Sequence, residues 1–132
     1  MPDAAQMDAA VKSYVDAYNR ADLTGLVGLF ALDATVEDPV GTPPKVGHGQ
    51  IGSFFADGIE LGAKLTLDGP VRCAADHAAF AFHVTLDWEG QTTRIDVIDI
   101  FHFDETGKIR EMRAFFGAEN MGPAQSDGPE EK

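Results

Sequence analysis

Two adjacent acids, Glu37 and Asp38, precede Pro39 at the end of a segment in which small or apolar residues alternate with polar ones. Successive side chains of a strand point to opposite faces, so Asp38 shares its face with Ala34 and Val36. Pro39 favours an extended backbone at the residue before it. The pattern predicts that Asp38 points inward with the apolar residues and that Glu37 points to solvent.

A second acid, Asp99, interrupts an apolar row in the segment 92–103, whereas Asp96 falls on the opposite, mixed face of the same predicted strand. Two apolar rows of this kind can form the wall of a cavity that contains a single acid. The residues that share the face of Asp99 are Ile95, Val97, Phe101 and Phe103, and the matching row of the preceding segment is Phe80, Phe82, Val84, Leu86 and Trp88.

The two inward acids have surroundings that favour different chemistry. Asp38 lies at a strand end beside a loop, where a carboxyl group can stay ionised and act as a general base. An ordinary Asp has a pKa of about 3.9, so keeping one protonated at pH 7 costs about 4 kcal/mol. Desolvation by the apolar row can offset this cost at Asp99. A neutral carboxylic acid can donate a hydrogen bond to a developing negative charge.

The elements that position these acids form an α+β fold, with helices first and strands after them. Three helical stripes are predicted, one with Asp3 and Gln6 as a capping pair and one with Asp22 as N-cap. The stripes are Met7, Val11, Tyr14, Val15 and Tyr18; Leu23, Leu26, Val27 and Phe30; and Ile51, Phe54 and Phe55. A short strand is predicted between the second and third helices, over residues 34–38.

From residue 64 onward the apolar period becomes two, which predicts an antiparallel meander covered on one face by the helices. The predicted strands are 64–68, 71–75, 78–88, 92–103 and 109–116, separated by turn-forming residues. We expect a single domain over residues 1–121. The segment 122–132 is acidic, polar and contains Pro and Gly, so we expect a disordered tail.

Composition excludes several classes of partner. The 132 residues carry a formal net charge of −12, which disfavours binding to nucleic acid or to an anionic membrane. The N-terminus lacks the basic and apolar regions of a signal peptide, so we expect a soluble, cytoplasmic protein. Cys73 is the only cysteine, and the four histidines are spread over predicted loops and outward faces, so no metal site is predicted. Those histidines are His48, His77, His83 and His102.

The segments 21–41, 94–104 and 112–120, which include ATVEDPVG, DVID and MRAFFGAEN, resemble the bacterial Δ5-3-ketosteroid isomerases. The resemblance covers roughly residues 5 to 120 and implies the cone-shaped, curved sheet of the nuclear-transport-factor-2-like (NTF2-like) fold, with three helices enclosing an apolar pocket. It also implies that Asp38 moves a proton from C4 to C6 of a 3-oxo-Δ5-steroid, without a cofactor. Tyr14 and a protonated Asp99 would donate hydrogen bonds to the dienolate oxygen, a role already known for this enzyme class.

Aromatic and aliphatic side chains are the candidates for the steroid pocket, although core packing explains the same stripes equally well. They are Phe54, Phe55, Phe82, Val84, Phe101, Phe116 and Trp88, of which Phe82 and Phe116 match steroid-lining positions of the family. Phe30 and Phe55 occupy positions where better-known members carry tyrosines behind the catalytic one. Tyr14 is therefore expected to lack its usual hydroxyl partner.

Two other functions are compatible with this fold, since fold alone does not decide function. A steroid-binding protein without catalysis would tolerate loss of Asp38. An epoxide hydrolase would depend on Arg94 and Asp96, which are predicted to lie on the face opposite Asp99. That outward face also carries Ile98 and Ile100, and exposed apolar sheet of this kind predicts a homodimer, as does the family resemblance.

Overall fold

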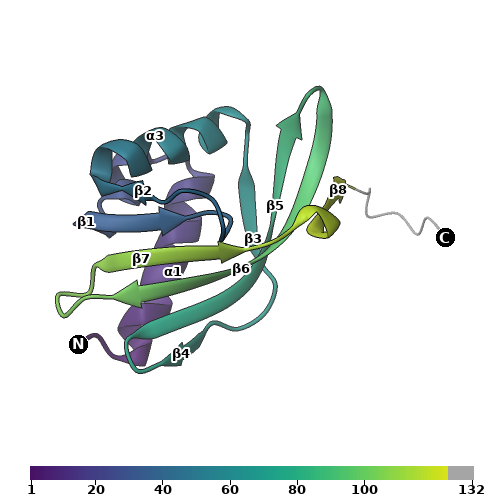
Figure 1. Cartoon of the computed structure of the whole chain (residues 1–132). Helices are drawn as coiled ribbons and strands as arrows, with labels where there is room; N and C mark the ends of the chain where they lie inside the picture. Colours follow the sequence, from purple (N-terminus) through teal and green to yellow (C-terminus); the bar gives the residue numbers. More distant parts are fainter. Residues whose placement is uncertain (125–132) are drawn as a thin grey trace.

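The computed structural model describes residues 1–124 and confirms an α+β fold in which helices precede most of the strands (Figure 1). The elements are α1 (Ala4–Asn19), α2 (Leu23–Val27), β1 (Phe30–Glu37), β2 (Lys45–Val46), α3 (Gly47–Glu60), β3 (Lys64–Leu67), β4 (Arg72–Ala74), β5 (His77–Trp88), β6 (Gln91–Phe103), β7 (Ile109–Phe115), the 3-10 helix η1 (Ala118–Asn120) and β8 (Met121–Pro123).

Both predicted helix starts are confirmed. The Asp3 carboxylate accepts a hydrogen bond from the Gln6 N–H, and the Gln6 side chain accepts one from the Asp3 N–H, so α1 begins with a capping box. The Asp22 carboxylate caps α2 by accepting from the Gly25 N–H at 3.0 Å. The prediction was wrong for Phe30, because α2 ends at Val27 and Phe30 is the first residue of β1.

The strands form one curved sheet in the order β2-β1-β7-β6-β5-β3, with β4 paired to β5 and β8 paired to β6. The predicted meander is confirmed for β5, β6 and β7, which pair antiparallel in chain order. One pair differs from the predicted antiparallel sheet, since β1 runs parallel to β7. Alternation within a strand sets its faces but not its neighbours, so this pairing could not be seen in the sequence.

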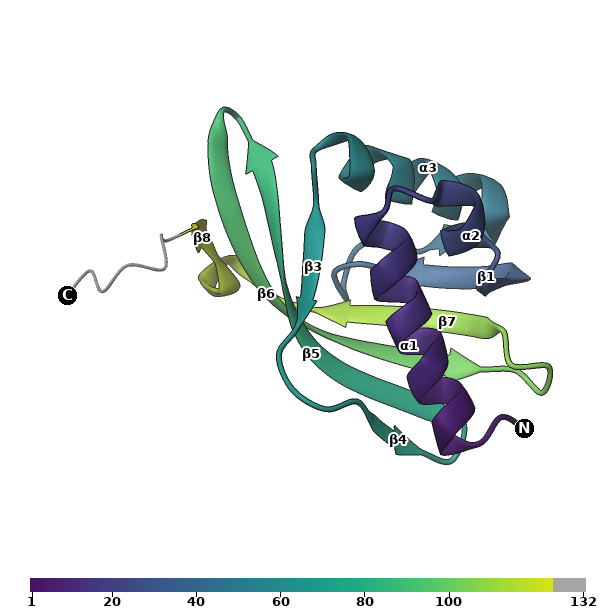
Figure 2. The ribbon, with the colours of Figure 1, turned by 180° about the vertical axis from the view of Figure 1, so that it is seen from behind.

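The helices cover one face of the sheet, the inner face, and leave the other, outer face open (Figures 1 and 2). In Figure 2, α1 crosses in front of β5, β6 and β7, while α3 lies beside β1. The core lies between these layers, and the apolar rows predicted for β5 and β6 face it. Its largest fully buried side chains include Phe30, Phe55, Phe80, Phe101, Met7 and Leu26.

The C-terminal part differs from the predicted tail. Residues 122 and 123 belong to β8, which pairs with the start of the long strand β6, and the Ala124 N–H donates to the Thr92 carbonyl. Pro123 is tolerated here because β8 is a short edge strand. The rest of the predicted tail, from residue 125, lies outside the described residues. Within residues 1–124, no helix has the length and apolar character needed to cross a membrane.

Candidate active site

A cavity of about 290 Å³ lies between the helices and the inner face of the sheet, close to the lower end of the range for small-molecule pockets. Its wall is mostly apolar, with a few polar side chains from α1, α3 and the end of β1. The lining residues are Tyr14, Tyr18, Asp38, Phe54, Phe55, Asp57, Gly58, Leu61, Ala63, Leu65, Phe82, Val84, Leu86, Ile95, Val97 and Phe116.

Asp38 follows directly after β1 and lines this cavity, as the alternation of the strand predicted. The peptide bond between Asp38 and Pro39 is cis, whereas the sequence indicated only an extended backbone. Burial raises the pKa of Asp38 from 3.8 to about 6, and the nearby charge of Lys45 opposes part of this rise. Asp38 is therefore mainly ionised at neutral pH, and it binds a proton more readily than an exposed Asp would.

Glu37, predicted to be the solvated acid of the pair, instead fastens the loop that carries Asp38. One carboxylate oxygen accepts from Arg113 Nε at 3.2 Å, and the other accepts from the Gly41 N–H at 3.1 Å. The Val40 N–H donates to the Ala114 carbonyl at 2.8 Å. Two residues of β7 therefore hold the loop on either side of Asp38.

Asp99 is completely buried on the inner face of β6, where it is paired in register with Phe80 on one side and Ala114 on the other. Neither of its carboxyl oxygens has a hydrogen-bond partner among residues 1–124. Burial raises the pKa of Asp99 well above its ordinary value, and the negative charge of Asp38 raises it further. Burial therefore favours the neutral carboxylic acid at Asp99, a form that has an O–H to donate. Asp99 does not itself line the cavity but lies two residues along the strand from Val97, which does.

Tyr14 lines the cavity from the middle of α1, and five aromatic rings surround its own ring. Phe101 lies nearest, at 5.2 Å between ring centroids, and the others are Phe55 at 6.0 Å, Tyr18 at 6.1 Å, Phe80 at 6.3 Å and Phe30 at 6.5 Å. Burial raises the pKa of Tyr14 well above its ordinary value, so the phenol stays protonated and can donate a hydrogen bond.

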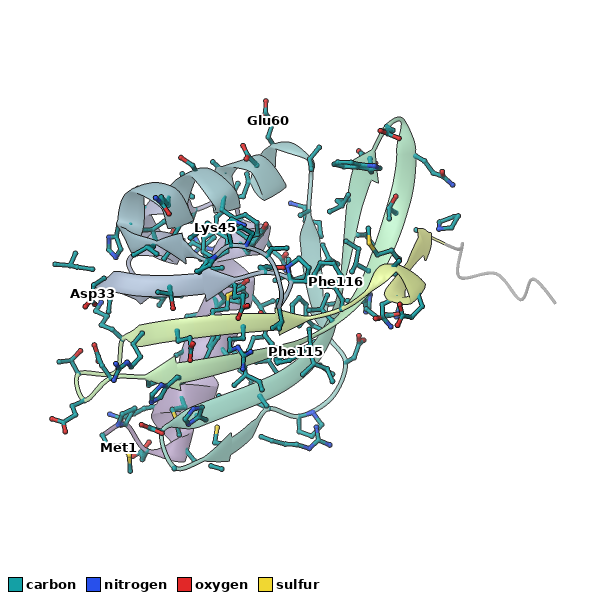
Figure 3. The ribbon with its side chains drawn as sticks, viewed as in Figure 1. Met1, Asp33, Lys45, Glu60, Phe115 and Phe116 are labelled. Carbon is teal, nitrogen blue, oxygen red and sulfur yellow. The ribbon has the colours of Figure 1, made fainter. Side chains whose placement is uncertain are left out.

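Most of the predicted pocket residues line the cavity, namely Phe54, Phe55, Phe82, Val84 and Phe116. Phe101 does not, because it is fully buried behind Tyr14 and Phe80. Trp88 is 53% exposed at the end of β5 and lies outside the lining. Figure 3 labels Phe116, which lines the cavity, beside Phe115, which is exposed on the outer face.

Sequence reasoning missed Tyr18 as a cavity residue, because its place in the apolar stripe of α1 is equally typical of a core tyrosine. Tyr18 is the only other tyrosine of the chain and lies one helical turn after Tyr14. Its hydroxyl occupies the space beside Gly58 of α3, where any Cβ would collide with it. Burial raises the pKa of Tyr18, so this phenol also stays neutral. The spacing of four residues from Tyr14 was the signal that could have revealed it.

Tyr14 and Asp38 thus line one cavity, and Asp99 lies fully buried on β6, a strand that also lines it, so three elements far apart in the sequence contribute to the site. The site offers an ionised carboxylate as proton acceptor and two neutral O–H donors within apolar walls. Donors in such surroundings stabilise developing negative charge much better than donors in water do. The arrangement suits abstraction of a carbon-bound proton beside a carbonyl group.

Comparison with known proteins agrees with this architecture. Residues 11–112 match the SnoaL-like domain. This chain belongs to the SnoaL-like family, which has the NTF2-like fold. A Steroid Delta-isomerase of Nocardioides simplex is 40% identical to this SnoaL-like protein over 118 residues, which are 89% of this chain and 94% of the relative.

Two further relatives of this SnoaL-like chain carry other names. Epoxide hydrolase LasB of Streptomyces lasalocidi is 29% identical over 128 residues, which cover 90% of this chain but only 44% of LasB. The solved structure of SalBIII, an epoxide hydrolase/cyclase-like enzyme with a role in pyran ring formation in the polyether salinomycin, superposes with a TM-score of 0.88 at 25% identity. That match covers 94% of this chain and all of the SalBIII chain.

Proposed function

We propose that this protein is a cofactor-independent isomerase that converts 3-oxo-Δ5-steroids to 3-oxo-Δ4-steroids. The similarity to the Steroid Delta-isomerase of Nocardioides simplex covers nearly all of both chains and supports this reaction. The observation in the structure that carries the proposal is Asp99, a buried acid whose oxygens have no partner among residues 1–124, beside a cavity that holds a second acid. Burying an unpartnered polar group is costly, so its presence favours a functional role.

In the proposed mechanism the Asp38 carboxylate takes the proton from C4 of the steroid. The electrons of the broken C–H bond form the dienolate, and its negative charge develops on the oxygen at C3. The hydroxyl of Tyr14 and the protonated carboxyl of Asp99 donate hydrogen bonds to that oxygen. The protonated Asp38 then returns the proton to C6, the double bond becomes conjugated with the ketone, and Asp38 is again a carboxylate.

The environments of the two acids support this division of roles. Asp38 has a pKa of about 6, which places the base close to neutral pH, where proton transfer in both directions is efficient. Burial raises the pKa of Asp99 well above its ordinary value, which favours the protonated form that the mechanism needs. Phe30 and Phe55, two of the five rings around Tyr14, carry no hydroxyl, so neither of them competes with the ligand for the Tyr14 O–H.

The direct test is to mix the purified protein with 5-androstene-3,17-dione and record ultraviolet absorbance, which rises as the conjugated enone forms. A steady increase proportional to protein concentration is expected. The Asp38→Asn variant serves as the control for non-enzymatic isomerisation. No increase above that control would overturn the proposed activity, and tight steroid binding without turnover would favour a binding protein instead.

The epoxide hydrolase alternative gains little from the position of its candidate residues. Arg94 and Asp96 form an ion pair with an Nη2–Oδ1 distance of 3.0 Å, and both side chains are about half exposed on the outer face of the sheet. They lie on the opposite side of β6 from the cavity. The name of LasB and the likeness to SalBIII therefore support a shared fold more than a shared reaction for this chain.

We also propose that the protein acts as a cytoplasmic homodimer that pairs through the outer face of the sheet. Ile98 is 50% exposed and Phe115 is 39% exposed on neighbouring strands there. Light scattering should give about twice 14.1 kDa, and Ile98→Arg should shift the particle to monomer. A native protein that stays monomeric at micromolar concentration would refute the dimer without affecting the proposed reaction.

A further inference from the structure

A cluster of metal-ligand side chains lies where β4 turns into β5, on the outer face of the sheet and away from the cavity. His77 and His102 are 25 residues apart in sequence, but they stand directly opposite each other on β5 and β6. The sequence placed these histidines on loops and outward faces but did not show that two of them meet. Asp76, the turn residue before β5, completes the group.

The Asp76 carboxylate joins the two imidazoles. One oxygen lies 2.9 Å from His77 Nδ1, and the other lies 2.9 Å from His102 Nε2. The ligand atoms of all three residues lie within 4.8 Å of one another. The two rings are stacked with their centroids 4.2 Å apart.

The backbone holds these three side chains together. The Phe103 N–H donates to the Asp76 carbonyl at 2.9 Å, which ties the turn to the end of β6. Ala75, the preceding residue, has a φ of 51°, a left-handed conformation that shapes the turn. The side chains therefore start from fixed backbone positions on two paired strands and the turn beside them.

We propose that Asp76, His77 and His102 bind one divalent transition-metal ion, with Zn²⁺ as the representative case. Two imidazole nitrogens and a carboxylate oxygen are the donor set that Zn²⁺, Ni²⁺ and Cu²⁺ prefer, whereas Ca²⁺ and Mg²⁺ prefer oxygen donors alone. Water would complete the coordination shell, as the ligands are partly exposed. The net charge of −12 also favours the approach of a cation.

Binding requires only small side-chain movements. The present hydrogen bonds place ring N–H groups against Asp76, so each imidazole must shift its proton to the other ring nitrogen before the nitrogen that faces Asp76 can offer a lone pair to a metal. Parallel rings do not aim their lone pairs at one point, so at least one ring must also turn about its Cβ–Cγ bond. The side chains of His77 and His102 are 48% and 25% exposed, which leaves room for this turn.

Glu111 of β7 adds a further carboxylate at the edge of the cluster. It is the cross-strand partner of His102, so the residues His77, His102 and Glu111 form one row across β5, β6 and β7. Partners directly opposite one another on a sheet have Cβ atoms about 5 Å apart. Glu111 can therefore orient an imidazole or a metal-bound water, which is the usual role of such outer carboxylates.

The test is calorimetric titration of Zn²⁺ into the untagged, chelator-treated protein. We expect one ion per chain with micromolar affinity and a rise in melting temperature of several degrees at saturating Zn²⁺. The variants His77→Gln and His102→Gln should each weaken binding by at least about 10–100-fold. Electron paramagnetic resonance of the protein loaded with one Cu²⁺ should show coupling to two imidazole nitrogens, and to one in either variant.

His83 provides a matched control, because its Nδ1 lies 2.8 Å from Asp68 Oδ2, but within residues 1–124 it belongs to no group of three possible metal ligands. The variant His83→Gln should bind Zn²⁺ as the native protein does. Melting temperatures without metal will show that the variants remain folded. Absence of binding by the native protein at about 100 μM Zn²⁺, or unchanged binding by the double variant His77→Gln/His102→Gln, would mean that the cluster is only a hydrogen-bonded turn.

Discussion

Asp99 and Asp96 lie three residues apart on one strand, yet the two faces of β6 give them opposite surroundings. Asp99 faces the helices, has no exposed surface and has no partner for its carboxyl oxygens within residues 1–124. Asp96 faces outward, is more than half exposed and pairs with Arg94. The residue type is the same, so the difference in chemistry comes entirely from what covers each face.

This difference shows how burial within the fold changes the chemistry of a carboxyl group. Desolvation penalises the charged form of a carboxyl group, and only the inner face of this sheet is desolvated. An exposed ion pair such as Arg94–Asp96 contributes little to stability or chemistry, because water screens it. Burial on the inner side therefore supports the proposed roles of Asp99 as a hydrogen-bond donor and Asp38 as a tuned base, while Asp96 on the outer face is solvated.

The largest expected effect is the loss of activity when the proposed base, Asp38, is replaced. Asp38→Asn removes the proton acceptor but keeps the size and polarity of the side chain, so kcat should fall by about 10²–10⁴ or more. Steroid affinity should stay intact or improve. Steady-state kinetics and equilibrium binding of the product steroid measure the two quantities separately. A loss in kcat below tenfold would contradict the assignment of Asp38 as base.

The next prediction compares substitutions on the two faces of β6. Asp99→Leu removes the O–H donor and should lower kcat by about 10²-fold or more, as deletion of other oxyanion donors does. Asp99→Asn keeps a donor of similar size and should cost much less. Asp96→Asn, on the outer face, is the matched control and should leave kcat nearly unchanged. Equal losses for Asn and Leu at position 99 would rule out the neutral-acid role.

Much of this contrast could be predicted from the sequence, because period-two alternation in β6 separates Asp99 from Asp96 without any knowledge of the neighbouring strands. Alternation also gave the inward direction of Asp38. It could not reveal the parallel pairing of β1 with β7 or the meeting of His77 with His102, because both depend on the register between separate segments. Tyr18 was missed and Phe101 was wrongly expected in the lining, because an apolar stripe does not show which residue borders the cavity and which lies behind it.

The dependence of folding stability on pH should also distinguish Asp38 from an exposed acid. Folding raises the pKa of Asp38 from 3.8 to about 6, so its ionisation opposes folding, and stability is lost as pH rises through about 6. A rise of about two pKa units corresponds to about 3 kcal/mol. Asp38→Asn should therefore be more stable than the native protein by up to about this amount at pH 8, and nearly equal to it at pH 4.

Urea unfolding at the two pH values measures this difference, with Asp96→Asn as the control that should show no such gain. Because Asp38 must be ionised to act as the base, kcat/KM of the native protein should also fall as pH drops below about 6. A stability gain for Asp38→Asn of the same size at both pH values would contradict the raised pKa.

The smallest expected effect concerns α3, the helix that carries Gly58 in the cavity wall. Gly58→Ala places a methyl group against the Tyr18 hydroxyl, so Tyr18 must move, and KM should rise a fewfold with little change in kcat. In a Tyr18→Phe background the hydroxyl is gone and only the ring carbon Cζ, 3.2 Å from the added methyl group, must shift slightly. Gly58→Ala should then stabilise α3 by up to about 1 kcal/mol through helix propensity. Gly49→Ala, where no atom lies within 4 Å of the added methyl group, is the control. A Gly58→Ala effect that is the same in both backgrounds would contradict this contact.

The loop that carries Asp38 is held on β7 by Arg113, a residue that also contacts the open outer face of the sheet. The Arg113 guanidinium, which holds Glu37, also lies 5.4 Å from the centre of the exposed Phe115 ring. If a second copy of the chain covers Phe115 as proposed, we expect it to change the position of Arg113 and, through Glu37, that of the loop that carries Asp38. The side-chain contacts Phe115–Arg113 and Arg113–Glu37 would then couple assembly of the protein to the rate of proton transfer.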